Sequence, residues 1–318
     1  MYMIKTLKIK SIELKNNIIL APMAGYTDVG FRTLCKRAGA GLTVTEMVSA
    51  KALSKGSIKT EDLLVSLPEE TPIAVQLFGR EPEAFEIAIK SGKLDKFDII
   101  DINMGCPAPK IVGNKEGSYL LNDINLAREI IETCVRSTTK PISVKFRSGY
   151  DEEHIIAVEF AKMCEEAGAS FITLHPRTKT QGYSGHSDWE LVKEVTSAVS
   201  IPVIVSGDVM TRKDVDYLTD TCGASGVMIG RASLGRPEIF DEIINNKKIS
   251  FSMADKLVQI KEHIKILSTF FNGKFVYSTM KKHILNYLKD FNGASKLKQV
   301  VCMTNSLDEM LDILESKI

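Results

Sequence analysis

The chain has 318 residues, of which 44% are hydrophobic and 25% are charged, so it can bury a large core without disulfides or structural metals. Its formal net charge of +1 excludes a uniformly basic nucleic-acid coat but allows local basic patches. No apolar run reaches the roughly 18 residues of a membrane span, and the start alternates apolar and charged residues instead of forming a secretory signal, which predicts a soluble cytoplasmic protein.

Short β-branched apolar runs recur along the first three quarters of the chain. Stretches with helical spacing, such as Phe85 with Ile89, separate most of them. Eight strands alternating with helices over about 240 residues predict a closed (β/α)8 TIM barrel of the α/β class, which we assign to residues 1–245. A doubly wound open sheet is the alternative, but no Gly-x-Gly-x-x-Gly follows the first run. The eight runs are Ile18–Ala21, Leu42–Thr45, Ile73–Phe78, Asp98–Ile102, Ile142–Phe146, Phe171–His175, Val203–Ser206 and Gly226–Ile229.

After Pro237 the strand pattern stops, and apolar residues follow helical spacing from Ala254 to the end. This pattern predicts a small all-α helical bundle, assigned to residues 250–318, with Asn246-Lys247-Lys248 as the linker. Its segment Lys274–Lys298 holds six lysines, one histidine and a single acid, Asp290, together with four aromatic residues.

Several of the eight runs contain polar residues or end in them. A TIM barrel builds its active site at the carboxyl ends of its strands, so these residues are candidates for the site. The first run leads into Ala21-Pro22-Met23-Ala24-Gly25, a small surface on which a flat ring can lie. Gln76 in the third run can donate and accept hydrogen bonds at a ring edge, or it can be a satisfied core amide. Lys145 in the fifth run can stabilise an anionic ring, or it can pair with a barrel carboxylate.

The fourth run ends in Asn103-Met104-Gly105-Cys106-Pro107, a bend that presents Cys106 at the barrel mouth. The other five cysteines lie among helix-like apolar residues, and no Cys-x-x-Cys pair indicates a zinc site or a disulfide framework. A thiol with a pKa near ~8.5 is mostly protonated at neutral pH, so Cys106 is a candidate general acid.

The last three runs end in His175-Pro176-Arg177, Ser206-Gly207-Asp208 and Gly230-Arg231. The loops after strands seven and eight of a TIM barrel commonly bind phosphate. Together these features predict an FMN site. In barrel order they are a surface for a flat ring, an amide at the ring edge, a lysine, a histidine and two glycine turns that can hold a phosphate. No cluster of metal-ligand spacing competes with it, so no metal is expected.

The chain resembles the bacterial tRNA-dihydrouridine synthase family, most closely its B-type branch, from about Ile18 to about Leu288. The resemblance implies FMN contacts from Pro22, Met23, Ala24, Gln76, Lys145, His175, Ser206, Gly207, Asp208, Gly230 and Arg231. It also implies NADPH (or NADH) as reductant and Cys106 as the proton donor. The blocks that carry it are Ala21–Gly25 with Thr27-Asp28 and Phe31-Arg32, Val75–Gly79, Asn103–Pro107, Val144–Arg147, His175–Thr178, Ser206–Asp208 and Met228–Arg231.

Three positions depart from the family pattern. Ser206 stands where relatives have Asn, Pro176 stands where they often have Gly, and Lys115 stands where they often have a small residue. The first change removes a side-chain contact but leaves the backbone cup. Lys115 has no firm explanation beyond a phosphate contact.

The resemblance further implies a tRNA partner, with Asn103 at the edge of the uracil and Arg177 as a second substrate contact. A base in folded RNA must be turned out of its stack to meet a flavin, so a second RNA-holding surface is required. Lys281, Lys282 and Lys289 are the candidates; a solvated helix face is the alternative.

Two rival functions stay open: an FMN barrel that reduces a free pyrimidine or another small enone, and an RNA-binding module with an inactive barrel. The sequence does not indicate which uridine is reduced or whether other RNAs are used. It indicates no protein partner, and a monomer is expected.

Overall fold

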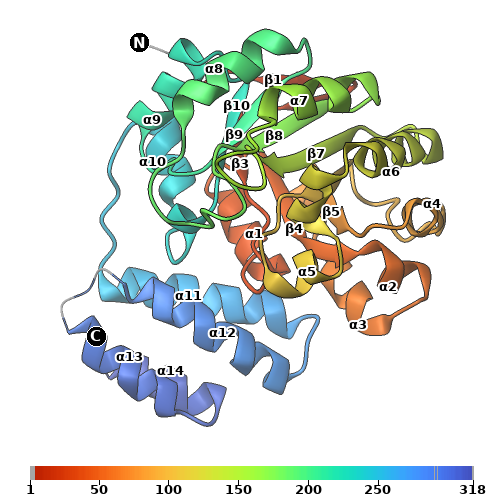
Figure 1. Cartoon of the computed structure of the whole chain (residues 1–318). Coiled ribbons are helices and arrows are strands. Elements are labelled where there is room, and N and C mark those ends of the chain that lie inside the picture. Colours follow the sequence, from red (N-terminus) through yellow and green to blue (C-terminus); the bar gives the residue numbers. More distant parts are fainter. Residues whose placement is uncertain (1–3, 290, 292, 317–318) are drawn as a thin grey trace.

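The computed structural model describes residues 4–289, 291 and 293–316, and its centre is a closed barrel of eight parallel strands (Figure 1). The strands are hydrogen-bonded in the order β10-β3-β4-β5-β6-β7-β8-β9, which confirms the predicted TIM barrel. They are β3 (Ile18–Leu20), β4 (Leu42–Ser49), β5 (Ile73–Phe78), β6 (Ile99–Met104), β7 (Ile142–Arg147), β8 (Phe171–His175), β9 (Val203–Ser206) and β10 (Gly226–Ile229).

Four of these strands have the predicted bounds, and three differ by one or two residues at one end or at both. The prediction for β4 was wrong: the sequence suggested an end at Thr45, but the strand continues to Ser49. Its pairing with β5 shifts register between Val44 and Met47, so the strand bends where its apolar run ends. The shift brings Met47 to the barrel mouth, where it lines a cleft described below.

The N-terminal end of the barrel is closed by an antiparallel hairpin of β1 (Leu7–Ile9) and β2 (Ile12–Leu14), which the sequence reading missed. Buried residues of the hairpin form one apolar cluster with barrel residues such as Leu42, Ile99 and Phe171. The apolar–charged alternation noted at the start of the chain is the pattern of a strand with one buried face. The barrel interior is therefore apolar at this end.

The helices that follow the strands cover the outside of the barrel (Figure 1). Their apolar faces form the largest core cluster together with the outward residues of the strands, among them Ile100, Ile102 and Met104 of β6. On the same strand Asp101 and Asn103 alternate with these residues and so face the barrel interior. The helices are α1 (Val29–Arg37), α2 (Ala50–Ser54), α3 (Ile58–Glu61), α4 (Pro82–Lys90), α5 (Pro109–Gly113), α6 (Ile124–Ser137), α7 (Ala157–Glu166), α8 (Trp189–Ala198), α9 (Arg212–Asp216) and α10 (Ile239–Asn245).

A C-terminal helical region follows, and it packs against α1 beneath the barrel in Figure 1. It has its own apolar cluster, to which α1 contributes Val29. Residues 246–252 connect it to α10, which agrees with the expected linker, while the division into domains at residues 245 and 250 stays a prediction. Among the described residues no helix has both the length and the apolar character needed to cross a bilayer. The region comprises α11 (Met253–Ser268), α12 (Gly273–Tyr287), α13 (Ala294–Met303) and α14 (Leu307–Glu315).

Candidate active site at the barrel mouth

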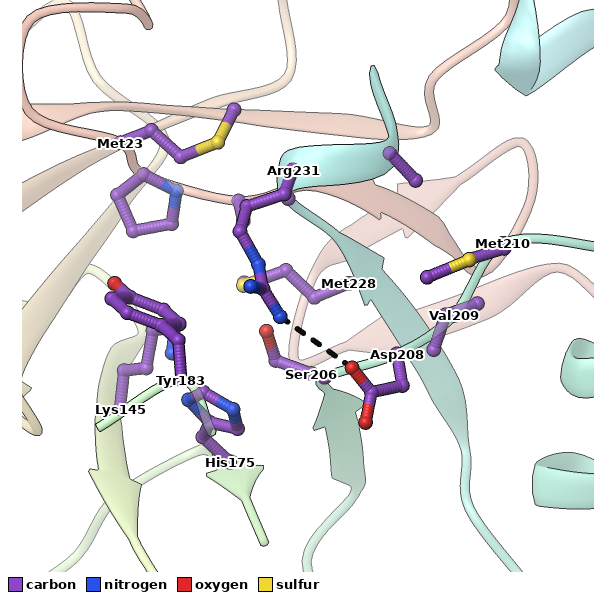
Figure 2. Close-up of a pocket in the computed structure, with 15 residues that line it drawn as sticks. Met23, Lys145, His175, Tyr183, Ser206, Asp208, Val209, Met210, Met228 and Arg231 are labelled. Atoms are coloured by element: carbon purple, nitrogen blue, oxygen red, sulfur yellow. Dashed lines mark hydrogen bonds and ion pairs between the residues drawn. The ribbon is translucent and has the colours of Figure 1, made fainter. Parts of the chain in front are cut away.

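Two adjoining hollows lie at the carboxyl ends of the strands. The inner hollow, of about 100 Å³, is bordered by residues 206–210 and 230–232 (Figure 2). The outer cleft, of about 660 Å³, extends from it toward Cys106 and Tyr26. Six residues line both, so the two form one continuous site: Pro22, Met23, Lys145, His175, Tyr183 and Arg231.

The segment after β3 forms a small-residue wall of this site. Pro22, Met23 and Ala24 line the outer cleft, and their contact with FMN stays a prediction. The turn is held because the Met23 N–H donates to the Thr27 hydroxyl at 3.0 Å and the Gly25 N–H donates to the Glu46 carboxylate. Gly25 has a φ of +79°, which a residue with a side chain rarely adopts.

The amide of Gln76 is buried and points into a polar group inside the barrel. Its Nε2 donates to an Asp101 carboxylate oxygen at 2.7 Å, and its Oε1 accepts from Asn103 Nδ2 at 2.8 Å. The other oxygen of Asp101 accepts from the Ser143 hydroxyl at 2.6 Å. Gln76 and Asn103 both line the outer cleft, whereas Asp101 lies beneath them.

Cys106 lies in the bend after β6 and lines the outer cleft. Its N–H donates to Asn103 Oδ1 at 2.9 Å, and its carbonyl accepts from the N–H and hydroxyl of Ser118. Burial raises the pKa of the Cys106 thiol above its usual value, against the lowering effect of the Ala108 N–H, Arg147 and Lys145. The thiol is therefore protonated at neutral pH, as a proton donor requires.

Lys145 is half-buried in β7, and its ammonium has neither a hydrogen bond nor an ion pair with any described residue. Burial lowers the pKa of Lys145 to about 8, with Arg147 acting in the same direction and Asp101 opposing it. The alternative of a direct pair with a barrel carboxylate therefore does not hold within the described chain. A cation held without a partner beside a pocket is suited to an anionic ligand.

His175 ends β8 beside the inner hollow (Figure 2). Burial, followed by the nearby charges of Lys145, Arg147, Arg177 and Arg231, lowers the pKa of His175 far below its usual range, so its ring is neutral at pH 7. A Cβ atom at Gly207 would lie 2.8 Å from the ring and 2.4 Å from the Ser187 hydroxyl. Glycine is required there because any side chain would collide with both groups.

The two glycine turns border the inner hollow, but the charged side chains beside them are paired with each other. Asp208 accepts from Arg177 at 2.7 and 2.9 Å. It also lies 3.5 Å from Arg231, the contact marked in Figure 2. Partial burial would raise the pKa of Asp208, but the Ser187 N–H and Arg177 outweigh it and lower that pKa. Phosphate binding here would use the backbone and Arg231, which is half-exposed.

Arg177 is buried and does not line either hollow. Besides Asp208, it donates to the carbonyl oxygens of Ser184 and Gly185, so it holds the loop between β8 and α8. The predicted substrate contact of Arg177 stays a prediction, and none of its described contacts supports it.

The sequence reading missed Arg147 and Tyr183. Arg147 donates to the carbonyls of Gly105, Thr178 and Gly182 and lies 5.5 Å from the centre of the Tyr183 ring. Tyr183 is 58% exposed and lines both hollows, with Arg231 on its ring at 4.8 Å. Arg147 belongs to the Val-Lys-Phe-Arg block and could have been found there, whereas no local pattern marks Tyr183.

The three candidate lysines of α12 differ in their positions. Lys282 is exposed and reaches toward the barrel mouth, where its Nζ lies 6.0 Å from the centre of the Tyr26 ring. Lys281 faces the other way and donates to Tyr277 and to the Thr304 carbonyl. Lys289 is exposed beyond the end of the helix, and Asp290 lies outside the described residues. Of the three, only Lys282 approaches the site.

Two members of the basic segment are not on the surface at all: His283 and Tyr287 are buried. His283 and His263 each place Nε2 within hydrogen-bonding distance of Asp28, the residue that begins α1. Among the described residues, these three side chains form the one group whose ligand atoms lie close enough together to bind a metal ion. A histidine that binds metal normally donates its second ring N–H, but His283 Nδ1 is buried without a partner, so hydrogen bonding explains the cluster better.

Comparison with known proteins identifies the family. The family model "Dihydrouridine synthase (Dus)" matches residues 19–318. The probable tRNA-dihydrouridine synthase of Rickettsia conorii is 36% identical over 94% of this chain and 92% of its own length. The tRNA-dihydrouridine synthase B of Vibrio cholerae is 34% identical over 97% of this chain and 98% of its own length.

Solved structures agree with the barrel fold. The old yellow enzyme homologue of Zymomonas mobilis has a TM-score of 0.57 at 14% identity, covering 78% of this chain and 94% of that one. Morphinone reductase has a TM-score of 0.56 at 12% identity, covering 78% and 91%. These identities establish the fold alone. Together with the match of the family model to residues 19–318, the sequence relatives show that the chain belongs to the dihydrouridine synthase family.

Proposed function

We propose that this protein is a tRNA-dihydrouridine synthase, which reduces the C5=C6 bond of uridine in tRNA with FMN and NADPH or NADH. The observation that carries the proposal is that a protonated thiol, Cys106, and an unpaired cation, Lys145, line the same cleft at the mouth of a TIM barrel. The family and the names of its members support the substrate. Because its proposed substrate is tRNA, we place the enzyme in the cytoplasm.

The residues present fit FMN. The small-residue wall of Pro22, Met23 and Ala24 leaves room for a flat ring, and Lys145 supplies the positive charge that an anionic reduced ring needs. The backbone of the turns at Gly207 and Gly230, with Arg231, borders the inner hollow where a phosphate would lie. A flavin held by these residues would supply the hydride for C6 of the uracil.

The side chains of the protein would orient the uracil and supply the proton for C5. Besides its bond to Gln76, Asn103 Nδ2 makes only a weak contact with Met47 Sδ at 4.0 Å, so its second N–H would turn to hold a carbonyl oxygen of the uracil. The Cys106 thiol transfers its proton to C5, and the thiolate that remains regains a proton from water. Lys282, beside Tyr26 at the edge of the cleft, would contact the RNA backbone of the flipped-out nucleotide.

The test is to mix the purified protein, FMN and NADPH with unmodified tRNA or with free uridine and to measure dihydrouridine. We expect product from tRNA and at least about tenfold less from free uridine at equal concentration, because the RNA surface contributes binding energy. Equal rates would favour the rival small-molecule reductase. A colourless protein that takes up no FMN on titration, but still binds tRNA, would favour the RNA-binding module.

A parallel reaction with NADH in place of NADPH, at equal concentrations, decides the reductant. We expect faster flavin reduction with NADPH, as the family resemblance implies.

A further inference from the structure

A continuous hydrogen-bond chain runs from the middle of the barrel to the Cys106 turn. It begins at Asp101 of β6, which accepts from Ser143 of β7 at 2.6 Å and from Gln76 of β5 at 2.7 Å. The three residues lie side by side because Gln76 pairs with Asp101 and Asp101 pairs with Ser143 in the parallel register. All three are buried.

The chain continues through Asn103. Asn103 Nδ2 donates to Gln76 Oε1 at 2.8 Å, and Asn103 Oδ1 accepts from the N–H groups of Gly105 and Cys106 at 3.1 and 2.9 Å. The N–H groups that shape the turn of the thiol are therefore connected, through two amides, to one carboxylate.

The direction of this chain follows from the chemistry of its first member. An amide can point either its oxygen or its NH2 group at a neighbour, but an ionised carboxylate only accepts. Burial raises the pKa of Asp101 to about 6, so the carboxylate is still ionised at pH 7 and requires the NH2 end of Gln76. This leaves the Gln76 oxygen for Asn103. Asn103 must then donate with its NH2 group, and its oxygen is left for the turn. The Asp101 carboxylate therefore determines the orientation of both amide side chains.

We propose that Asp101 is a positioning residue: through Gln76 and Asn103 it fixes the amide orientations at the cleft and holds the turn that presents the Cys106 thiol. The catalytic role of the Cys106 turn rests on the proposed function. The hydrogen-bond chain that holds the turn does not depend on that function. A buried carboxylate with no contact to the cleft is costly to keep, and this role accounts for its place at the centre of the barrel.

One consequence concerns the uracil. Because two N–H groups occupy Asn103 Oδ1, the Asn103 side chain can offer the substrate only its second Nδ2 N–H, which otherwise contacts Met47 Sδ at 4.0 Å. It can bind a carbonyl oxygen of the pyrimidine, but it cannot accept from the ring N–H. The site therefore selects a heterocycle that presents a carbonyl at this point.

The test uses the reactivity of Cys106 and needs neither RNA nor NADPH. In a Cys302→Ser background, which removes the exposed cysteine, Cys106 is the half-exposed thiol beside four buried ones. We would measure its alkylation by iodoacetamide from pH 7 to 10. The unaltered protein should show an apparent pKa above the ordinary value of about 8.5, because the turn holds the thiol in a partly buried position.

Asp101→Ala should loosen the turn, raise the alkylation rate at pH 7.5 about fivefold or more and move the apparent pKa toward about 8.5. Asn103→Ala should do the same. If Asp101 acts through Asn103, the double variant should be no more reactive than Asn103→Ala alone. Additive effects, or an unchanged alkylation profile in Asp101→Ala, would overturn the proposal.

Two further variants keep the test decisive. Asp101→Asn can still place an oxygen toward Gln76 and its NH2 toward the Ser143 hydroxyl, so it should restore the profile to within about threefold. Thr173→Val is the matched control, since it removes a buried barrel hydroxyl that has no partner, and it should leave the profile unchanged.

If Asp101→Ala does not fold, Gln76→Leu interrupts the same chain one link later and should reproduce the Asn103→Ala profile. A Gln76→Leu profile like that of the parent protein would then refute the inference. Because alkylation is measured without substrate, failure of this inference is distinguishable from failure of the proposed enzymatic activity.

Discussion

The Nε2 atom of His283 lies 2.8 Å from a carboxylate oxygen of Asp28, although 255 residues separate the two in the chain. His263 binds the other oxygen at 2.9 Å, and Asp28 also caps α1 by accepting from the Phe31 N–H. The contact therefore joins α11 and α12 to the segment that continues from the small-residue wall of the site. Lys282, the neighbour of His283 in the chain, reaches the barrel mouth on the same helix.

Replacing Asp28 by Ala should lower the free energy of unfolding by about 3–5 kcal/mol, because both buried histidines lose their acceptor. Urea unfolding at pH 7.5 measures this. Asp188→Ala is the matched control, since Asp188 is an exposed aspartate that caps α8 in the same way, and its loss should cost only about 1 kcal/mol. Equal losses in the two variants would mean that the contact with α11 and α12 contributes nothing.

Stability should fall as the pH drops below about 6.5. Burial is the leading cause that lowers the folded-state pKa of both His175 and His283. Nearby Lys and Arg side chains add to the effect at His175, whereas at His283 the neighbouring His263 adds to it and Asp28 opposes it. The unfolded chain therefore binds protons near pH 6.5 that the folded protein does not. The slope is at most ~1.4 kcal/mol per pH unit for each such histidine.

Urea unfolding midpoints at pH 8, 7, 6 and 5 measure this dependence. His175→Gln should flatten it, and the exposed His186→Gln should not. The pKa of Asp28 is itself lowered, because its two histidines outweigh the effect of burial. Its contribution is present above its unfolded pKa of about 3.9 and disappears only as the pH falls through the lower folded value. A midpoint that is constant from pH 8 to 5 would contradict the histidine assignment.

Cys106→Ala should keep FMN binding and NADPH oxidation but lose at least about 100-fold in the rate of uridine reduction, the usual effect of removing a general acid. Single-turnover reduction of tRNA by the prereduced enzyme measures this step alone. Cys302→Ser is the control, because Cys302 is exposed on α13. Normal turnover by Cys106→Ala would remove the thiol from the mechanism.

Lys282→Ala should weaken tRNA binding and reduce the slope of log K against log salt by about one, since one phosphate contact is lost. The exposed Lys265 of α11 provides the control, and its replacement by Ala should leave the slope unchanged. Titrations from about 50 to 200 mM salt are sufficient. If the two variants bind alike, Lys282 does not contact the RNA.

The barrel and the thiol turn could be predicted because their signals are local. Each buried parallel strand is a short β-branched run, so β5, β8, β9 and β10 have the predicted bounds. Asn103–Pro107 could be placed at the barrel mouth because Gly105 and Pro107 end the strand wherever the chain folds. β4 was predicted too short because its last residues depart from this pattern at the register shift.

The sequence alone therefore determined which elements form, their order around the barrel and which strand ends carry reactive side chains, because these follow from periodicity and from turn residues close in the chain. Only the tertiary structure decided which polar groups meet. It paired Asp28 with His283, turned Arg177 away from the cleft, and joined Asp101 to Cys106 through two amides. Such contacts depend on strand register and on the docking of helices more than 200 residues away, and neither leaves a local pattern.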